Sequence, residues 1–531
     1  MLDHPWLLLL AALLLLLVLV TIHDITQKRH TIIRNFPVIG HFRYWLEKVG
    51  PELRQYIVTA NDEERPFTRD ERRWIYASSK NENRYFGFGS DNDMERTPGY
   101  VIVRHAAFPA PAPRIDPVTE LPAAKVLGAF HGRTHAFRPN SIVNVSGMSY
   151  GALGSRAHEA LNRGCAIAGC LQNTGEGGLS DHHLHVGDLT FQIGTGYFGC
   201  RDLTTGAFSL AALQETIARG PVRAIEIKLS QGAKPGHGGI LPGAKVTAEI
   251  ARIRGVQEGV DCVSPPGHAA FGDIDTMLEF IEEVAAATGL PVGIKSAVGE
   301  QRFWSELAEK MRATGTGPDF ITVDGGEGGT GAAPLVFSDH VSLPFTIGMA
   351  EVYRAFAAQG LHEDVVFVGS GRLGLPERTL VAFALGCDMV SIGREAMLAI
   401  GCIQAQKCHT GHCPTGVATM RPWLMRGLDP TVKSARLANY IATLRSDLLD
   451  LARTCGAEHP ALVDLDMVSV LDEHFGVRPL RDTFGYEPGW GTPHSEDLDG
   501  LRSLLEARGS IDSSDADYVS AARPNRGRSD D

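Results

Sequence analysis

The sequence lacks the features that mark several classes of protein. Nine cysteines among 531 residues are too few for the disulfide framework of a small secreted domain. Basic residues do not predominate either, because 50 Lys and Arg stand against 62 Asp and Glu. The resulting formal net charge of −12 argues against a general nucleic-acid-binding protein. No internal repeat is visible. What remains, 44% hydrophobic and 21% charged residues, is the composition of a globular protein with a large buried core.

Charge is absent from one long stretch near the N-terminus. Residues 6–22 read WLLLLAALLLLLVLVTI, which as a helix spans about 26 Å, slightly less than a hydrocarbon core. A cleaved signal peptide is the alternative, but it requires basic residues before the apolar run. Here Asp3 precedes the run, whereas Lys28 and Arg29 follow it. Because positive charge stays on the cytoplasmic side, we predict a single-pass membrane anchor over residues 1–23, with the catalytic domain on the cytoplasmic side.

The segments on either side of the central region show no clear alternation of strands and helices. Residues 24–120 contain a highly charged stretch, NDEERPFTRDERRW, and we predict an irregular N-terminal extension there. Residues 456–531 are predicted to form a C-terminal extension. Its last residues, about twenty in number, are rich in Ser, Asp, Gly and Arg and are expected to be disordered.

The central region alternates short β-branched runs with helical runs. The strand candidates are SIVNV (141–145), GCLQN (169–173), AIEIKL (224–229), DCVSP (261–265), PVGIKS (291–296), FITVDG (320–325), VVFVGS (365–370) and MVSIGR (389–394). Helical patterns occupy residues 155–164, 273–289, 302–315, 348–360 and 375–386. Eight strands with intervening helices predict an α/β fold, a (β/α)8 TIM barrel, within a domain over residues 121–455. A doubly wound sheet is less consistent, because polar or glycine-rich motifs follow nearly every strand rather than the first alone.

Three of the cysteines lie close together in the sequence. Cys402, Cys408 and Cys413 form a C-x5-C-x4-C pattern within GCIQAQKCHTGHCPTG. Several thiolates on one loop suit an iron–sulfur cluster. Zinc, with His409 and His412 nearby, and the absence of any metal remain open from spacing alone. The other six cysteines are interpreted as small apolar core residues: Cys165, Cys170, Cys200, Cys262, Cys387 and Cys455.

Two glycine-rich loops follow consecutive late strands. DGGEGGTGAAP (324–334) follows one strand and GSGR (369–372) follows the next. Glycine lets backbone N–H groups converge on an oxyanion, so the pair favours a phosphorylated cofactor such as FMN. Lys295 ends the preceding strand and could stabilise negative charge on a reduced flavin, or it could be a structural ion-pair partner.

Charged residues also follow earlier strands. Glu176 lies in NTGEGG, Lys234 lies between glycines in QGAKPGHGG, and Arg254 lies on the helix that follows. Arg favours carboxylate recognition because its fork can bond both oxygens. Each residue alone could be a surface charge, but their positions near the ends of neighbouring strands favour a common site.

Several ordered motifs resemble one known family. The matching strings are GMSYGALG (147–154), LQNTGEGG (171–178), QGAKPGHGGILPG (231–243), SPP (264–266), DGGEGGTGAAP (324–334) and AIGCIQAQKCHTGHCPTGVAT (399–419). Over residues 140–455 the chain resembles the FMN and iron–sulfur region of bacterial glutamate synthases. It is most similar to short stand-alone proteins of that family that carry an N-terminal hydrophobic helix.

The resemblance implies roles for particular residues. It implies that Cys402, Cys408 and Cys413 hold a 3Fe–4S cluster. Met148, Ser149, Gln192 and Lys295 would surround the FMN ring, and Gly326, Gly371 and Arg372 would lie near its phosphate. Glu176, Gln231, Lys234 and Arg254 would line a 2-oxoglutarate pocket, with Lys234 and Glu176 as the catalytic residues. The implied reaction is the reductive amination of 2-oxoglutarate to L-glutamate.

The chain also departs from the family pattern. The N-terminal cysteine of the family's glutaminase domain has no counterpart in MLDHPW. The family's PGEGG is PGHGG here, with His237, and a second string becomes PPGHAAFGD (265–273). We therefore expect free ammonia or a separate ammonia donor, and electrons from a protein such as ferredoxin or from a membrane carrier. The alternatives are a transferase similar to methylamine–glutamate N-methyltransferase and a membrane-side flavin and iron–sulfur electron-transfer protein.

Overall fold

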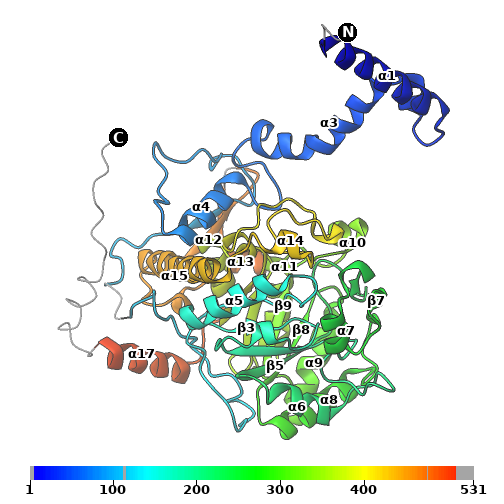
Figure 1. The fold of residues 1–531 in the computed structure, drawn as a ribbon. Helices are drawn as coiled ribbons and strands as arrows, with labels where there is room; N and C mark the ends of the chain where they lie inside the picture. The colour runs from blue at the N-terminus through cyan, green and yellow to red at the C-terminus, as the bar shows by residue number, and fades with distance from the viewer. Residues whose placement is uncertain (1–4, 112–114, 475, 510–531) are drawn as a thin grey trace. The chain divides into compact units, whose positions relative to one another are not determined.

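The computed structural model describes residues 5–111, 115–474 and 476–509, and the chain divides into two compact units, Met1–Arg72 and Arg73–Asp531. The first unit contains α1 (Pro5–Thr26), α2 (Thr31–Asn35), α3 (Gly40–Leu53) and a π-helical turn, η1 (Arg54–Val58) (Figure 1). Within α1, residues Trp6–Thr26 are long and apolar enough to cross a membrane, and none of the side chains from Trp6 to His23 is buried. The membrane anchor itself stays a prediction.

The segment 24–120 is not irregular throughout, contrary to the prediction. Besides α2 and α3 it contains α4 (Arg69–Lys80) and the short strand β1 (Val101–Val103). The charged stretch that suggested irregular chain includes the start of α4, in which Arg72, Ile75 and Ser79 are buried. These three residues recur at helical spacing, so the charges belong to the exposed face of an amphipathic helix.

The second unit is built around a closed parallel barrel, which confirms the predicted fold class. Around the barrel the strands are β2 (Val143–Val145), β3 (Gln172–Asn173), β4 (Leu189–Ile193), β5 (Val222–Lys228), β8 (Val292–Ser296), β9 (Phe320–Asp324), β10 (Val366–Ser370) and β11 (Met389–Ile392). The last strand pairs with the first, with Val390 opposite Val143, so the sheet has no open edge.

One of the eight predicted strands was wrong. DCVSP contains β7 (Cys262–Val263), which pairs antiparallel with β6 (Ile240–Leu241) in a separate two-stranded sheet. The missing barrel strand is β4, whose five residues are all buried. No α-helix separates β3 from β4, only the 3-10 turn η2 (Asp181–His183), so the strand–helix alternation fails at this point of the sequence.

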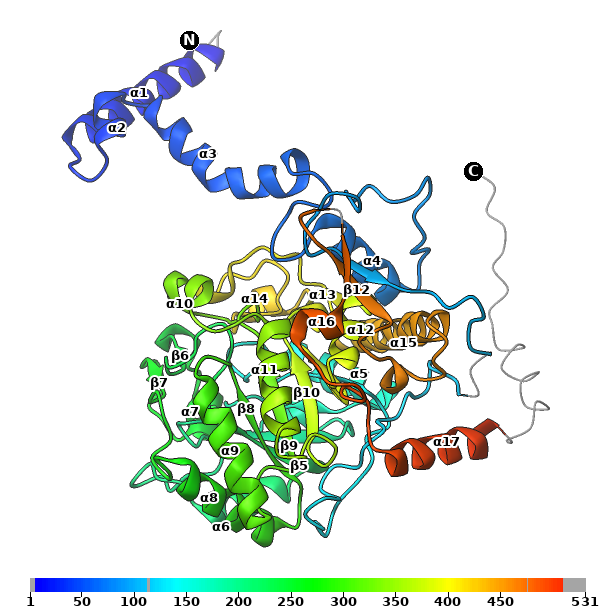
Figure 2. The same cartoon turned by 180° about the vertical axis from the view of Figure 1, so that it is seen from behind.

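Helices surround the barrel (Figure 2). The predicted ones are α5 (Ser155–Ala168), α8 (Ile274–Thr288), α9 (Gln301–Thr314), α11 (Phe345–Ala357) and α12 (Pro376–Ala384). The helix expected to carry Arg254 is α7 (Ala248–Arg254). The structure adds α6 (Leu210–Ile217), α10 (Leu335–His340), α13 (Arg394–Ala399), α14 (Pro422–Met425) and α15 (Pro430–Thr454). The long α15 packs along α5, where Arg445 is fully buried and donates to the Ala168 and Val118 carbonyl oxygens.

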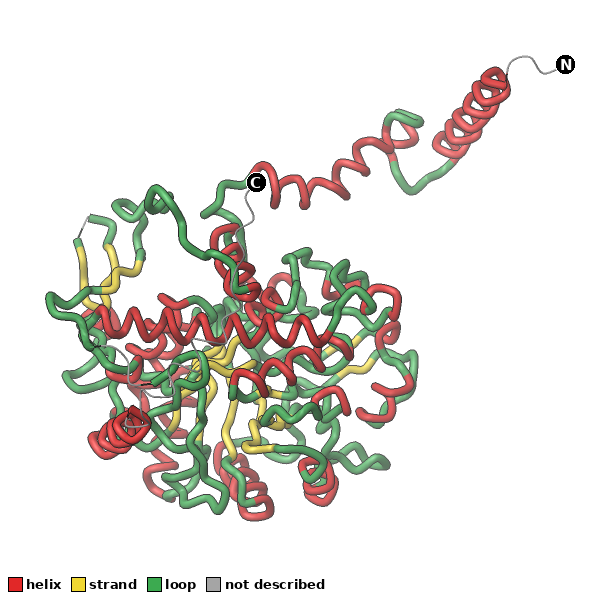
Figure 3. Tube along the Cα trace, turned by 60° about the vertical axis from the view of Figure 1, so that its left-hand side comes forward, coloured by secondary structure: helices red, strands yellow, loops and turns green. Residues whose placement is uncertain are grey.

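Chain segments from before and after the barrel form a third sheet. β1 pairs with β12 (Val468–Leu471), which pairs with β13 (Val477–Pro479), both antiparallel (Figure 3). The helices α16 (Leu480–Phe484) and α17 (Ser495–Gly509) complete the described chain. The predicted disorder of the final residues lies outside the described ranges.

The packing of α5 on α15 gives a prediction about stability. A Cβ atom on Gly164 would lie 2.8 Å from Leu437 Cβ and 2.9 Å from the Ser434 carbonyl oxygen. Gly164→Ala should therefore lower the free energy of unfolding by about 1–3 kcal/mol in urea denaturation, because the helices must separate. Ile167→Ala, at an exposed position of α5, should change it by less than about 0.5 kcal/mol. If helix propensity decided the outcome, Gly164→Ala would instead stabilise the protein.

Candidate functional site

Buried polar side chains gather at the C-terminal ends of the barrel strands. Asn173 on β3, Gln192 on β4, Glu226 on β5, Lys295 on β8 and Asp324 on β9 are all less than 9% exposed. Because the strands are parallel and the barrel is closed, these ends meet at one mouth. Enzymes with this fold build their active sites there.

The carboxylate of Glu226 organises the centre of this mouth. It accepts hydrogen bonds from Asn173 Nδ2 at 2.9 Å, Gln192 Nε2 at 2.5 Å and Thr322 Oγ1 at 2.8 Å. Gln192, predicted to contact the flavin ring, is thereby fixed in orientation. The sequence analysis missed Glu226, although an acidic residue inside the otherwise apolar run AIEI is a recognisable signal.

The loop that carries the predicted flavin residues Met148 and Ser149 approaches the same centre. A Cβ atom on Gly147 would lie 2.7 Å from Asn173 Oδ1 and 3.0 Å from Gln192 Nε2. Only glycine allows this approach. The loop after β2 is therefore held against the hydrogen-bonded amides of β3 and β4.

Lys295 forms a buried ion pair, one of the two roles that the sequence left open for it. Its Nζ lies 3.6 Å from Asp324 Oδ2 and 3.5 Å from Ser146 Oγ. Asp324 Oδ2 also accepts the backbone N–H of Gly232 at 2.9 Å, which ties the loop after β5 to β9. Burial raises the pKa of Asp324, but Lys295 and the Gly232 N–H outweigh it and hold the pKa below its ordinary value.

A second ion pair joins Glu176 to Lys228, a residue that the sequence analysis missed. Lys228 Nζ lies 3.1 Å from Glu176 Oε1 and donates to Gln231 Oε1 at 2.6 Å. Burial raises the pKa of Glu176. Lys228 lowers it, followed by Lys234 and Arg254, and together they outweigh burial, so the pKa of Glu176 lies below its ordinary value. Glu176, Gln231, Lys234 and Arg254 are thus brought into one electrostatic neighbourhood, as predicted for a common site.

Lys234 and Arg254 are buried cations without a carboxylate within ion-pair distance among the described residues. Lys234 is 6% exposed and donates to the Ala332 carbonyl oxygen at 3.1 Å. Burial lowers the pKa of Lys234, and Glu176 opposes the shift only in part. Arg254 is 5% exposed and donates to the Tyr150 carbonyl oxygen at 2.8 Å, while its Nε has no hydrogen-bond partner. An unpartnered buried guanidinium N–H suits an anionic ligand.

The charges at the mouth do not cancel. Four buried or nearly buried cations, Lys228, Lys234, Lys295 and Arg254, face three carboxylates, Glu176, Glu226 and Asp324. The excess positive charge favours an anionic ligand over a neutral or cationic one.

The loop PPGHAAFGD (265–273), which differs from the family's string, also reaches this site. His268 Nε2 donates to the Lys228 carbonyl oxygen at 2.9 Å, and its Nδ1 lies 3.2 Å from the Tyr197 hydroxyl. Burial lowers the pKa of His268, so the ring is neutral at neutral pH. His237 stacks on Phe337 with the ring centroids 5.2 Å apart.

The two glycine-rich loops lie against each other. They follow β9 and β10, which are the sixth and seventh strands of the barrel, and a Cβ atom on Gly371 would lie 3.2 Å from the Gly325 nitrogen. Gly371 and Arg372 both have positive φ, +128° and +53°. The N–H of Gly326 donates to the Leu343 carbonyl oxygen at 2.8 Å, so this amide is engaged within the protein.

The loop after the eighth strand adds a cation that the sequence analysis missed. Arg394 directly follows Gly393 after β11, and its guanidinium donates to the Glu327 carbonyl oxygen in the loop after β9. In the sequence, the Gly-Arg pair at the end of the predicted strand MVSIGR indicates a cation at this position. Late strands of a barrel with adjacent Gly and Arg are typical of phosphate sites.

The three cysteines lie on one loop after α13. Tyr76 donates to the Cys402 carbonyl oxygen at 2.8 Å, and Lys245 donates to those of Cys408 at 2.8 Å and Ala418 at 3.3 Å. Burial raises the pKa of Cys402 to about 12, with further contributions from Cys408 and Cys413. Metal coordination would therefore have to displace the thiol protons.

In the described part of the chain, no three His, Cys, Asp or Glu side chains are arranged around one metal position. The thiolates of a cluster bind different iron atoms and do not need to converge on one point. His409 and His412 are exposed, and His412 Nδ1 bonds the Thr410 carbonyl oxygen at 2.9 Å. The other six cysteines are free and buried, as predicted.

Comparison with known proteins identifies relatives of this chain. The family model for a conserved region in glutamate synthase matches residues 126–458. A glutamate synthase large subunit-like protein, YerD, of Bacillus subtilis strain 168 is 40% identical over 475 residues, which cover 83% of this chain and 89% of YerD. An archaeal glutamate synthase [NADPH] of Methanocaldococcus jannaschii is 36% identical over 317 residues, 59% of each chain. A glutamate synthase large subunit-like protein of Rhizobium meliloti is 32% identical over 370 residues, which cover 66% of this chain and 80% of that protein.

The ion pair between Lys228 and Glu176 can be tested by stability measurements. Lys228→Met should lower the free energy of unfolding by about 3–5 kcal/mol, because it leaves the Glu176 carboxylate buried without its partner. The double variant Lys228→Met/Glu176→Gln should recover part of this loss. If the changes in unfolding free energy of the two single variants simply added in the double variant, the two side chains would not be coupled.

The same ion pair has a defined pH dependence. Because the pKa of Glu176 is lowered in the folded protein, the stabilisation is complete above the ordinary value of 4.5 and is lost as the pH falls through the folded-state pKa. The difference in unfolding free energy between the wild type and Lys228→Met should therefore be constant near neutral pH and decrease in acid.

Proposed function

Because this chain belongs to the glutamate synthase family, and is an oxidoreductase of that type, we propose that it converts 2-oxoglutarate to L-glutamate with FMN and a 3Fe–4S cluster. The observation that carries the proposal is the group of cations around Glu176 at the barrel mouth. A protein that only transfers electrons has no need of a cationic binding site. A keto acid with two carboxylates loses hydration when it is buried, and nearby cations compensate for that loss.

Each residue of this group has a distinct role in the proposal. Arg254 binds a substrate carboxylate through its free N–H. Lys234 holds its proton at Nζ and donates a hydrogen bond to the keto oxygen, which draws electron density from the carbon that ammonia attacks. Glu176, kept ionised by Lys228, accepts a proton as the amine nitrogen loses its positive charge.

In this proposal, residues on and after β2, β4 and β8 would hold a flavin ring at the barrel mouth. Gln192, oriented by Glu226, offers an amide, and Lys295 offers a cation that would stabilise negative charge on a reduced ring. The Gly371–Arg372 loop and Arg394 suit the phosphate. The ammonia adduct of the keto acid loses its hydroxyl group as water, with the proton that Glu176 has accepted. Bound FMN would supply the hydride that reduces the resulting imino acid, and the protein contributes orientation and charge.

Cys402, Cys408 and Cys413 fit the cluster, since three thiols on one loop are available and Lys245 lies at the same loop. A bound cluster would supply electrons to a flavin at the barrel mouth. The electrons come from a protein such as ferredoxin or from a membrane carrier, and nitrogen comes as free ammonia or from a separate ammonia donor. The helix α1 anchors the enzyme in the membrane, with the barrel on the cytoplasmic side because Lys28 and Arg29 follow the apolar run.

Activity is predicted to depend on Lys234. Dithionite-reduced enzyme supplied with 2-oxoglutarate and ammonium should form glutamate, and Lys234→Met should slow this by about 100-fold or more. Lys310→Met, at a surface ion pair with Asp275 on the barrel exterior, should keep the wild-type rate. Flavin reoxidation that never depends on 2-oxoglutarate would instead indicate an electron-transfer protein. A methylated amino acid formed from methylamine and glutamate would indicate the transferase.

The cluster assignment has a separate test. The purified wild type should contain about three iron atoms per chain, and Cys408→Ser should lose most of this iron together with the low-temperature EPR signal of the oxidised cluster. Cys455→Ser, a free cysteine far along the chain, should retain both. Unchanged iron in Cys408→Ser would refute the ligand assignment.

A further inference from the structure

The helix α3 carries an apolar stripe that is open to solvent. Phe42, Trp45, Leu46 and Leu53 recur at helical spacing and are 59%, 55%, 41% and 39% exposed. Phe42 and Trp45 stack on each other with the ring centroids 5.6 Å apart. Large apolar side chains at this spacing normally face a core, so the stripe requires a covering partner.

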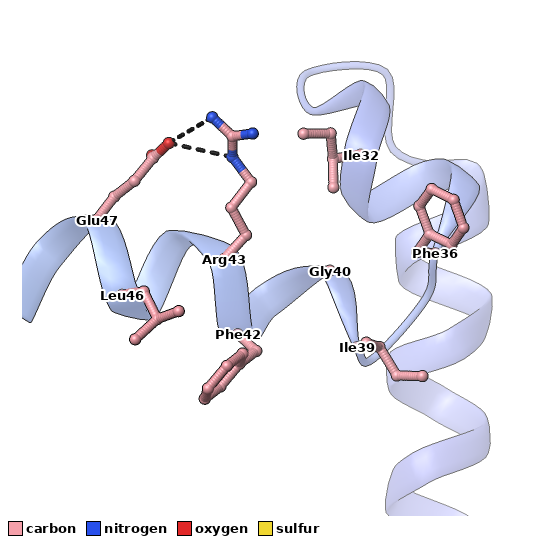
Figure 4. Close-up of a pocket in the computed structure, with 8 residues that line it drawn as sticks. All are labelled: Ile32, Phe36, Ile39, Gly40, Phe42, Arg43, Leu46 and Glu47. Carbon is pink, nitrogen blue, oxygen red and sulfur yellow. Dashed lines mark hydrogen bonds and ion pairs between the residues drawn. The ribbon is translucent and has the colours of Figure 1, made fainter.

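A groove extends this stripe toward the preceding helix. It has a volume of about 590 Å³. Its lining comes from α2, the turn after it and α3: Ile32, Phe36, Ile39, Gly40, Phe42, Arg43, Leu46 and Glu47. Figure 4 shows Phe42 and Leu46 on one side of α3, while Arg43 and Glu47 form an ion pair on the other side. The helix is therefore amphipathic, with a charged face opposite the apolar one.

A buried carboxylate fixes the corner between α1 and α3. Asp24, near the end of α1, is 0% exposed and accepts the Val38 N–H at 2.8 Å and the His41 ring N–H at 2.9 Å. Val38 adopts a φ of +64°, which turns the chain. As a result α3 does not continue the direction of α1 (Figure 1, Figure 3). An amphipathic helix whose axis turns away from a membrane span can lie in the plane of the interface.

Charge at the corner matches a membrane surface. Lys28 and Arg29 are exposed in the turn between α1 and α2, Arg34 is exposed on α2, and Lys48 is exposed on α3. Cations beside an apolar span are attracted to anionic headgroups, and Trp and Tyr are enriched at the same depth. The apolar stripe, the aromatic rings and the cations therefore occur together directly after the apolar helix.

We propose that α3 and the turn before it form an interfacial element, with the apolar stripe inserted among the lipid acyl chains and the basic residues at anionic headgroups. This inference rests on the proposed membrane anchor and is independent of the proposed reaction. The occupant of the groove is lipid. The Asp24 corner sets the direction of α3 and thereby the depth of Trp45.

The test uses the full-length protein in vesicles of phosphatidylcholine and phosphatidylglycerol whose phosphatidylcholine acyl chains carry bromine, a quencher of tryptophan fluorescence. Three variants, Trp6→Phe, Trp45→Phe and Trp423→Phe, each lack one exposed tryptophan. Subtracting the fluorescence of each variant from that of the wild type gives the signal of Trp6 on α1, Trp45 on α3 or Trp423 in the barrel unit. Bromine should remove about half or more of the Trp6 and Trp45 signals and leave the Trp423 signal unchanged. In Asp24→Ala, quenching of Trp45 should fall to the level of Trp423 while that of Trp6 persists.

The outcomes separate the two proposals. An unquenched Trp6 would overturn the membrane anchor. A quenched Trp6 with an unquenched Trp45 would leave the anchor standing and overturn the interfacial role of α3; a second copy of the chain or another protein would then cover the stripe. Equal quenching of Trp45 and Trp423 would also overturn it, since insertion would not be specific to α3.

Discussion

Compensation of buried charge at the barrel mouth is the constraint on which the rest of the catalytic unit depends. Closing eight parallel strands brings their C-terminal ends together, and polar side chains there leave water when the barrel forms. Glu226 is stabilised by three neutral donors from three strands, and Asp324 by Lys295 and the Gly232 N–H. These contacts satisfy the buried groups and also hold neighbouring strands and loops in one register.

The remaining charge at the mouth explains what the site can bind. Glu176 has its counterion in Lys228, which leaves Lys234 and Arg254 with backbone carbonyl oxygens as their hydrogen-bond partners. Hydrogen bonds to carbonyl oxygens satisfy the N–H donors but do not neutralise the positive charge. An anionic ligand can therefore bind to two buried cations with little rearrangement of the protein. The same arrangement disfavours a neutral substrate, because the cations would then stay unpaired.

Much of this arrangement could be predicted from the sequence, and the exceptions have physical reasons. Motifs that follow strands placed Glu176 and Lys234 at the mouth, and the end of a predicted strand placed Lys295 there, because parallel strands share one direction. Glu226 and Lys228 were missed because they lie in the apolar run AIEIKL, which was interpreted only as a strand. β4 was missed because no helix precedes it, and α3 and α4 because their amphipathic spacing was hidden by charge. The contacts of His268 depend on tertiary structure that no local pattern encodes.

One departure from the family motifs, the loop that carries His268, reaches Lys228. Its ammonium holds Glu176 and Gln231, whereas its carbonyl oxygen accepts from His268, in the loop that differs from the family string. Burial lowers the pKa of His268 and so favours the uncharged ring beside Glu176. The loop can therefore differ in sequence while the charges around Glu176 stay the same.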